Sequence, residues 1–155
     1  MARGGVLGVM HRGFWAIAVL FAAAFAASAQ GPDRLADVKT MGNCAGCVLM
    51  GQDFSDRRLM GVKFDAAQIT DTVFYRASLN IAVFDDATLT GVRFDGAALK
   101  GASFVGTRLV DVSFEGADLS GAVFEGAVLE RTDLSAARLC NTQIPGDIMD
   151  KSDCE

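Results

Sequence analysis

The sequence predicts a repeat fold in which the chain bends round a narrow axis. The first observation is a strict period of five: from Leu49 to Ile144 every fifth residue, twenty in all, is leucine, isoleucine or phenylalanine. The second is that leucine or isoleucine alternates with phenylalanine at these positions as far as Leu129. Because a helix repeats every ~3.6 residues and a strand every ~2, the architecture must come from the repeat itself.

The third observation is a small inward residue in each unit. Two positions before each large apolar residue, from Val62 onward, the chain has alanine, valine or threonine. Glycine is frequent two positions after it, as at Gly91 and Gly101, and glycine turns a corner without a Cβ penalty. Charged residues concentrate at the three remaining positions of the unit, which we expect to face water.

The repeat resembles that of the pentapeptide-repeat family, whose unit is loosely A-(D/N)-L-x-x. The stretch Ala117-Asp118-Leu119-Ser120-Gly121 matches this unit outright. The resemblance covers residues 45–146 and implies an all-β fold. The implied fold is a right-handed, four-sided parallel β-helix with four units per coil and about five coils.

In that geometry residues twenty apart stack, and the phenylalanines of residues 45–146 fall into two core ladders. One ladder is Phe54, Phe74, Phe94 and Phe114, and the other is Phe64, Phe84, Phe104 and Phe124. The remaining two sides are lined by leucine and isoleucine. Since such a core is filled by its own side chains, we expect no cofactor and no metal site.

The first residues read as an export signal. Arg3 and Arg12 precede or flank an apolar run, 14–26, and Ala27-Ser28-Ala29 fits the pattern cleaved by a signal peptidase. The apolar run is shorter than the roughly 20 residues that span a bilayer. We therefore expect residues 1–29 to be removed near Ala29/Gln30, which makes the mature protein periplasmic or secreted and leaves it free of the membrane.

Cleavage changes the composition, and the new composition excludes some classes of function. The net charge of −5 becomes 12 − 19 = −7, and His11, the single histidine, is lost. A chain without histidine has no histidine-based catalytic triad, and its acidic balance argues against nucleic acid as a partner. Paired carboxylates such as Asp85-Asp86 lie at outward positions without a pocket. We expect no enzyme.

The sequence departs from the repeat pattern at both ends. In the first coil Gln52 and Arg57 occupy inward positions, so we expect that coil to be irregular or open to solvent, because an unpaired buried arginine is costly. Residues 30–44 are expected to form an N-terminal cap segment, in which 33–40 are predicted to be a short helix. After Pro145-Gly146, residues 147–155 are predicted to be a short polar tail.

Four cysteines flank the predicted coils. With twenty residues per coil, Cys47 and Cys140 lie in the first and last coils, too far apart for a bridge. The expected disulfides are Cys140–Cys154 and, if formed, Cys44–Cys47. The C-x-x-C of Cys44 and Cys47 leaves a thiol–disulfide redox role open.

These observations favour an exported, non-catalytic structural or protein-interaction module with an unidentified protein partner. A candidate interaction surface is Val83, Val105 and Val123, outward positions on one side of the coils. An alternative follows from the resemblance: family members include DNA mimics that bind type II topoisomerases. Acidic columns such as Asp65 and Asp85 fit that alternative, but basic residues interrupt them.

Overall fold

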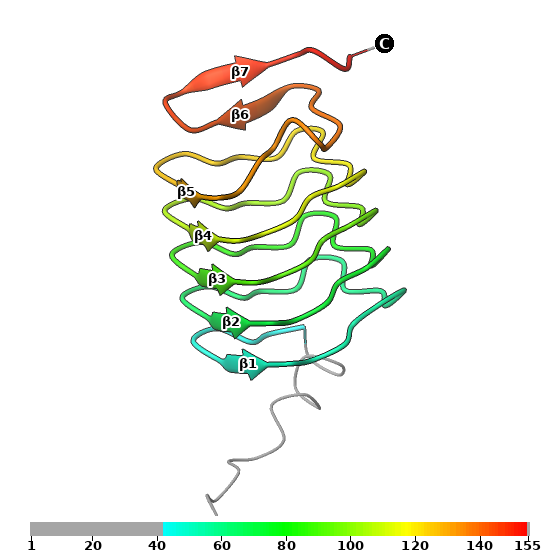
Figure 1. The fold of residues 1–155 in the computed structure, drawn as a ribbon, viewed down its shortest axis with the longest axis vertical. Helices are drawn as coiled ribbons and strands as arrows, with labels where there is room; N and C mark the ends of the chain where they lie inside the picture. Colours follow the sequence, from blue (N-terminus) through cyan, green and yellow to red (C-terminus); the bar gives the residue numbers. More distant parts are fainter. Residues whose placement is uncertain (1–41, 155) are drawn as a thin grey trace, which may run out of the picture. The chain divides into compact units, whose positions relative to one another are not determined.

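The coils form a parallel β-solenoid (Figure 1). The computed structural model describes residues 42–154. Its seven strands have three residues each: β1 (Val48–Met50), β2 (Gln68–Thr70), β3 (Thr88–Thr90), β4 (Arg108–Val110), β5 (Val128–Glu130), β6 (Thr142–Ile144) and β7 (Ile148–Asp150). These residues include no helix that is long and apolar enough to cross a membrane.

The twenty-residue register is visible in one sheet. Strands β1 to β5 pair in parallel in chain order, and Val48 faces Gln68, which in turn faces Thr88. Isolated parallel bridges with the same spacing, such as Asp53 with Val73 and Arg58 with Ser78, hold the other sides. The four units of each turn therefore form four sides, and every turn pairs with the next through its backbone.

The two phenylalanine ladders fill the interior as expected. All eight rings are at most 1 % exposed. Rings one turn apart are stacked, as in Phe84 and Phe104, whose centroids lie 4.9 Å apart at 3°. Rings of opposite ladders meet edge to face, as in Phe94 and Phe104 at 6.1 Å and 82°. Both geometries are favourable for aromatic pairs.

Inward threonines are compatible with this core because their hydroxyls are satisfied. Thr107 donates its hydroxyl proton to the Phe84 carbonyl over 2.8 Å, and Thr142 does the same to the Leu119 carbonyl over 2.8 Å. Among the described residues, no buried side-chain nitrogen or oxygen lacks a hydrogen-bond partner. The interior of the described coils is therefore filled by side chains, and its buried side-chain polar atoms are all hydrogen-bonded.

The first coil is open to solvent at Arg57, but its backbone is regular. Arg57 is exposed, and its carbonyl still accepts a 2.8 Å bond from the Ser78 amide. Gln52 is half-buried, and its side-chain amide donates to the Met50 carbonyl over 2.9 Å. The predicted capping helix, 33–40, and the predicted signal segment, 1–29, lie outside the described residues.

The C-terminal segment differs from the polar tail that the sequence predicts. Strands β6 and β7 form an antiparallel hairpin in which Ile144 faces Ile148. The turn between them uses Gly146 and Asp147, with φ of 89° and 61°. In Figure 1 the hairpin follows the last turn of the stack. The preceding Pro145-Gly146 was the available signal for this hairpin.

Candidate functional site

From Gly46 to Gly146, every corner of the solenoid except the one at Ala136 places one residue in the left-handed region. Glycine occupies many of these positions, and aspartate, arginine or alanine occupies others. One corner column holds Gly61, Ile81, Gly101, Gly121 and Asn141. Ile81 is the exception in this column, because it is a β-branched residue at a φ of 53°. Left-handed backbone costs an L residue with a Cβ roughly 1–2 kcal/mol, and β-branching makes it a genuine outlier.

The Ile81 side chain is also exposed. Its relative exposure is 60 %. It lies across the two neighbouring glycines: Ile81 Cδ1 is 3.8 Å from the point that a Cβ would occupy on Gly61, and Cγ2 is 3.5 Å from that point on Gly101. The isoleucine is therefore an apolar knob between two glycines of its corner column, Gly61 and Gly101. Strained residues of this kind cluster at functional sites.

The predicted interaction surface adjoins this knob. Val83 and Val123 lie in one outward column with Ser103 between them, as the bridges Val83–Ser103 and Ser103–Val123 show. Val105 is two residues beyond Ser103 on the same side. All three valines are half-buried, so each offers less apolar area than Ile81. The period of five marks Ile81 only as an outward corner, and the glycines at the equivalent positions Gly61 and Gly101 were the available signal in the sequence.

Other exposed apolar side chains are more dispersed. Val48 and Met50 of β1 are 57 % and 66 % exposed, and Met60 of the first coil is 64 % exposed. Ile148 and Met149 of β7 are 58 % and 52 % exposed. Tyr75 is 42 % exposed and stacks under the guanidinium of Arg76 at 5.7 Å.

Some acidic residues on the solenoid surface are paired with basic ones. Within residues 42–154, five ion pairs join outward columns or neighbouring turns: Arg76–Asp56, Arg93–Asp95, Lys100–Asp118, Arg108–Glu130 and Arg131–Asp111. The Arg131 guanidinium donates two hydrogen bonds to Asp111, at 2.6 and 2.7 Å. These bonds lower the pKa of Asp111 below its usual value and raise that of Arg131. The field around the coils is mixed, without a long unbroken acidic column.

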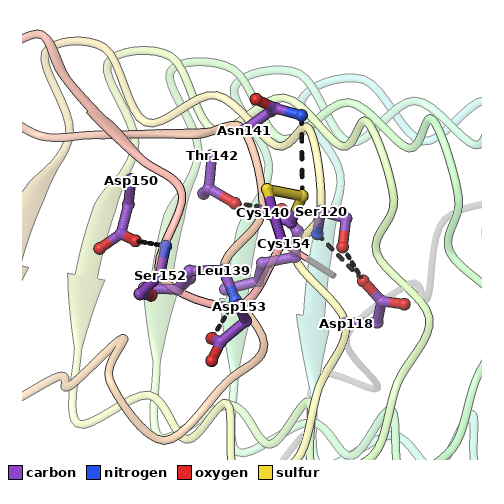
Figure 2. Close-up of a disulfide and its surroundings, with 11 residues drawn as sticks. Asp118, Ser120, Leu139, Cys140, Asn141, Thr142, Asp150, Ser152, Asp153 and Cys154 are labelled. Carbon is purple, nitrogen blue, oxygen red and sulfur yellow. Dashed lines mark hydrogen bonds between the residues drawn. A yellow bond between two sulfur atoms is a disulfide. The ribbon is translucent and has the colours of Figure 1, made fainter.

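The four cysteines form two bridges, in the same pairing that the sequence predicts. Cys44 and Cys47 are joined within the first coil, and Cys140 and Cys154 are joined fourteen residues apart. Figure 2 shows the second bridge with Asp153 beside it. The Asp153 carboxylate accepts a 2.8 Å bond from the Leu139 amide, and the Asp153 amide donates to the Leu139 carbonyl over 2.9 Å. The bridge therefore holds the C-terminal residues against the last coil.

A shallow depression of about 560 Å³ adjoins this bridge. It is lined by Ser135, Ala137, Arg138, Ser152, Asp153 and Cys154. Within the range 42–154, no group of three or more histidine, cysteine or acidic side chains could hold a metal ion. The paired carboxylates Asp85 and Asp86 do not face a common pocket. Asp85 accepts from the Val105 amide over 3.0 Å, and Asp86 is exposed at a corner.

Comparison with known proteins identifies the family that has this repeat geometry. The sequence model described as pentapeptide repeats (8 copies) matches residues 67–106, 77–116 and 107–142. A search of curated proteins finds no match. Among solved structures, a pentapeptide-repeat protein of the Arabidopsis thaliana thylakoid lumen is 27 % identical, with a TM-score of 0.53, over 69 % of this chain and 71 % of that one.

Two cyanobacterial structures are more distant. Rfr23 of Cyanothece is 21 % identical over 66 % of this chain and 90 % of that one, with a TM-score of 0.38. HetL of Nostoc, involved in heterocyst differentiation regulation, is 23 % identical over 70 % of this chain and 51 % of that one, with a TM-score of 0.34. From the repeat, the solenoid and the matching family model together, the chain belongs to the pentapeptide-repeat family.

Proposed function

We propose that this protein is an exported, non-catalytic docking module that binds one protein partner through Ile81 and the neighbouring valines. The observation that carries the proposal is the exposed Ile81 side chain on left-handed backbone. Gly61 and Gly101 hold the same position without strain, so folding has no need of an isoleucine there. An apolar knob of this kind fits an apolar pocket on a partner surface.

The position of the knob supports a single contact region. Ile81 precedes Val83 by two residues, and Val123 lies two turns further along the same outward column. Gly101 and Gly121 leave the corner between them without side chains, which lets a partner approach the backbone closely. The contact region so defined is Ile81, Val83, Val105 and Val123. Its occupant is a folded protein that presents an apolar pocket.

A filled interior supports a role at the surface. The phenylalanine and leucine ladders leave the coils without an internal chamber, and the depression at Cys154 is shallow. An active site usually needs a cavity with titratable groups of perturbed pKa. The aspartates with lowered pKa, such as Asp111 and Asp133, lie at the surface, where hydrogen bonds from Arg131 and Ser135 stabilise their charged forms.

Export is supported by the apolar leader and by the two disulfides, because disulfides persist in oxidising compartments. The solved structure that is 27 % identical is a protein of the thylakoid lumen. N-terminal sequencing of the protein from its native cells tests this part. A mature start near Gln30 in an extracytoplasmic fraction is expected, and an intact Met1 in the cytoplasm would contradict export.

Site-specific photo-crosslinking tests the contact region. A photoreactive amino acid is placed at position 81 or 123 in one set of cells and at position 68, on the sheet side, in another. The same partner should be recovered from positions 81 and 123 and be absent from position 68. Equal recovery from Gln68, or crosslinks only to a second copy of this chain, would refute the proposed contact.

The variant Ile81→Asn separates binding from stability. Asparagine occurs at the equivalent Asn141, at a φ of 51°, so it accepts this backbone. Relief of strain should leave the free energy of unfolding unchanged or raise it by about 1 kcal/mol. Crosslinking from position 123 should nevertheless fall. If binding persists while the fold is intact, Ile81 is not the anchor.

A DNA-mimicking role has less support. A protein that mimics DNA needs continuous columns of negative charge. Here ion pairs on the surface, such as Arg93 with Asp95, place positive charges among the negative ones. A redox role for Cys44 and Cys47 also has less support, because the two residues are 4 % and 1 % exposed and thiol exchange needs access to a sulfur.

A further inference from the structure

The two disulfides differ in their access to solvent. Cys44 and Cys47 are enclosed in the first coil, whereas Cys154 is exposed and Cys140 is half-buried. Exchange begins when an attacking thiolate reaches one sulfur of a disulfide. The accessible bridge is therefore the C-terminal one, although the C-x-x-C motif had drawn attention to the other.

The shallow depression beside Cys154, about 560 Å³ in volume, has a charged and hydroxyl-rich lining. Arg138 brings a positive charge to the lining and Asp153 a negative one. Within residues 42–154 no carboxylate forms an ion pair with the Arg138 guanidinium, in contrast to Arg76, Arg93, Arg108 and Arg131. Ser135 and Ser152 add hydroxyl groups.

This lining complements a small peptide thiol that carries carboxylates and an ammonium group. The Arg138 guanidinium can receive a carboxylate. The Asp153 carboxylate accepts one bond from the Leu139 amide and keeps acceptor capacity for an ammonium group. Cys154 contributes to the same lining, so a thiol bound there would be next to the disulfide. An uncharged thiol would gain nothing from Arg138.

We propose that the Cys140–Cys154 disulfide is a thiol-exchange site for small peptide thiols of the glutathione class, which dock at Arg138. The bound thiolate attacks Cys154 Sγ, the Cys140–Cys154 bond breaks, and a mixed disulfide forms on Cys154. Cys140 leaves as a thiolate and takes a proton from water. A second thiol then attacks the mixed disulfide, which frees Cys154 as a thiol and releases the oxidised dimer of the small thiol. Two electrons pass from two small thiols to one protein disulfide.

Opening this bridge changes the end of the solenoid. The C-terminal residues contact the last coil through the bridge and through the two Asp153–Leu139 hydrogen bonds shown in part in Figure 2. Strand β7 stays paired with β6, so only the last few residues are released. The Leu139 amide and carbonyl then lose their Asp153 partners. Exchange therefore regulates access to the C-terminal end of the coils.

The test is the rate of reduction of the oxidised full chain by glutathione and by uncharged 2-mercaptoethanol, compared at equal thiolate concentration. Alkylation at set times, followed by peptide mass spectrometry, reports each disulfide separately. Glutathione should open Cys140–Cys154 at least about tenfold faster than Cys44–Cys47, because only the former is accessible. Arg138→Gln should slow the glutathione reaction about threefold to fivefold by removing the charge, and leave the 2-mercaptoethanol reaction unchanged.

Arg58→Gln is the matched control. Arg58 lies in the same outward column as Arg138, at the other end of the coils, and its replacement should alter neither rate. Equal slowing of both thiols by Arg138→Gln, or no slowing of glutathione, would overturn the docking role. Earlier opening of Cys44–Cys47 would overturn the assignment of the site. Opening by a protein dithiol alone, with no reaction of glutathione, would overturn the choice of ligand.

Discussion

Removal of one ring from the middle of a phenylalanine ladder should destabilise the protein more than removal of the ring at its end. Phe94 is fully buried. It stacks on Phe74 at 5.1 Å and on Phe114 at 5.2 Å, and it meets Phe84 and Phe104 edge to face. Phe54, at the end of the same ladder, has one stacked partner, Phe74 at 5.2 Å.

The magnitudes follow from these contacts. Phe94→Ala should lower the free energy of unfolding by about 3–5 kcal/mol, the usual range for a buried phenylalanine. Phe54→Ala should cost roughly 1–2 kcal/mol less, since it loses fewer aromatic pairs of about 0.5–1.5 kcal/mol each and the open first coil can relax. Phe94→Leu keeps most of the buried apolar area and should cost about 2 kcal/mol. Leu134 continues this ladder in the native chain.

The assay is urea denaturation of each variant with both disulfides intact, followed by far-ultraviolet circular dichroism. Unchanged slopes of free energy against urea would show that the denatured states are comparable. Equal losses for Phe94→Ala and Phe54→Ala would refute the claim that stacking between turns determines the cost. A loss below about 1 kcal/mol for Phe94→Ala would refute the filled core altogether.

Three other predictions concern the core and the surface. Thr107→Val removes the bond to the Phe84 carbonyl and should cost about 1 kcal/mol, measured as a shift of the urea midpoint. Ala102→Leu should lower stability by at least about 1–3 kcal/mol by overpacking the interior, again seen in urea. The Asp111 pKa is lowered by the Arg131 hydrogen bond, so its contribution is present above the unfolded pKa of about 3.9 and is lost as the pH falls through the lower folded value. Asp111→Asn should therefore lower the urea midpoint at pH 7, and this difference from the native protein should shrink as the pH falls below about 4.

The repeat predicted the interior well because each inward position recurs every five residues. Val48, Gln68 and Thr88 align as a twenty-residue turn requires, and this spacing also separated Cys47 from Cys140. The β6–β7 hairpin was missed because it lies beyond the last repeat, where no neighbouring unit repeats its pattern. Local turn chemistry in Pro145-Gly146 was the available signal.

The candidate surface was predicted less well for a physical reason. The period of five tells which residues point outward, and Val83 and Val123 were found in this way. It does not tell how much of each outward side chain remains exposed after its neighbours pack. Ile81 differs from Gly61 and Gly101 in backbone strain, which its place in a column of glycines indicates, and in its exposed side chain, whose exposed fraction is known only once the neighbouring turns are stacked.

The most direct test of surface docking is the dissociation constant of the crosslinked partner for three purified proteins: the native chain, Ile81→Asn and Gln68→Ala. Gln68 is exposed on the sheet side and serves as the matched surface control. We predict that Ile81→Asn weakens binding at least about tenfold, roughly 1.4 kcal/mol, with unchanged or slightly raised thermal stability, and that Gln68→Ala has no effect on binding. Unaltered affinity of Ile81→Asn, or an equal loss in Gln68→Ala, would contradict the account.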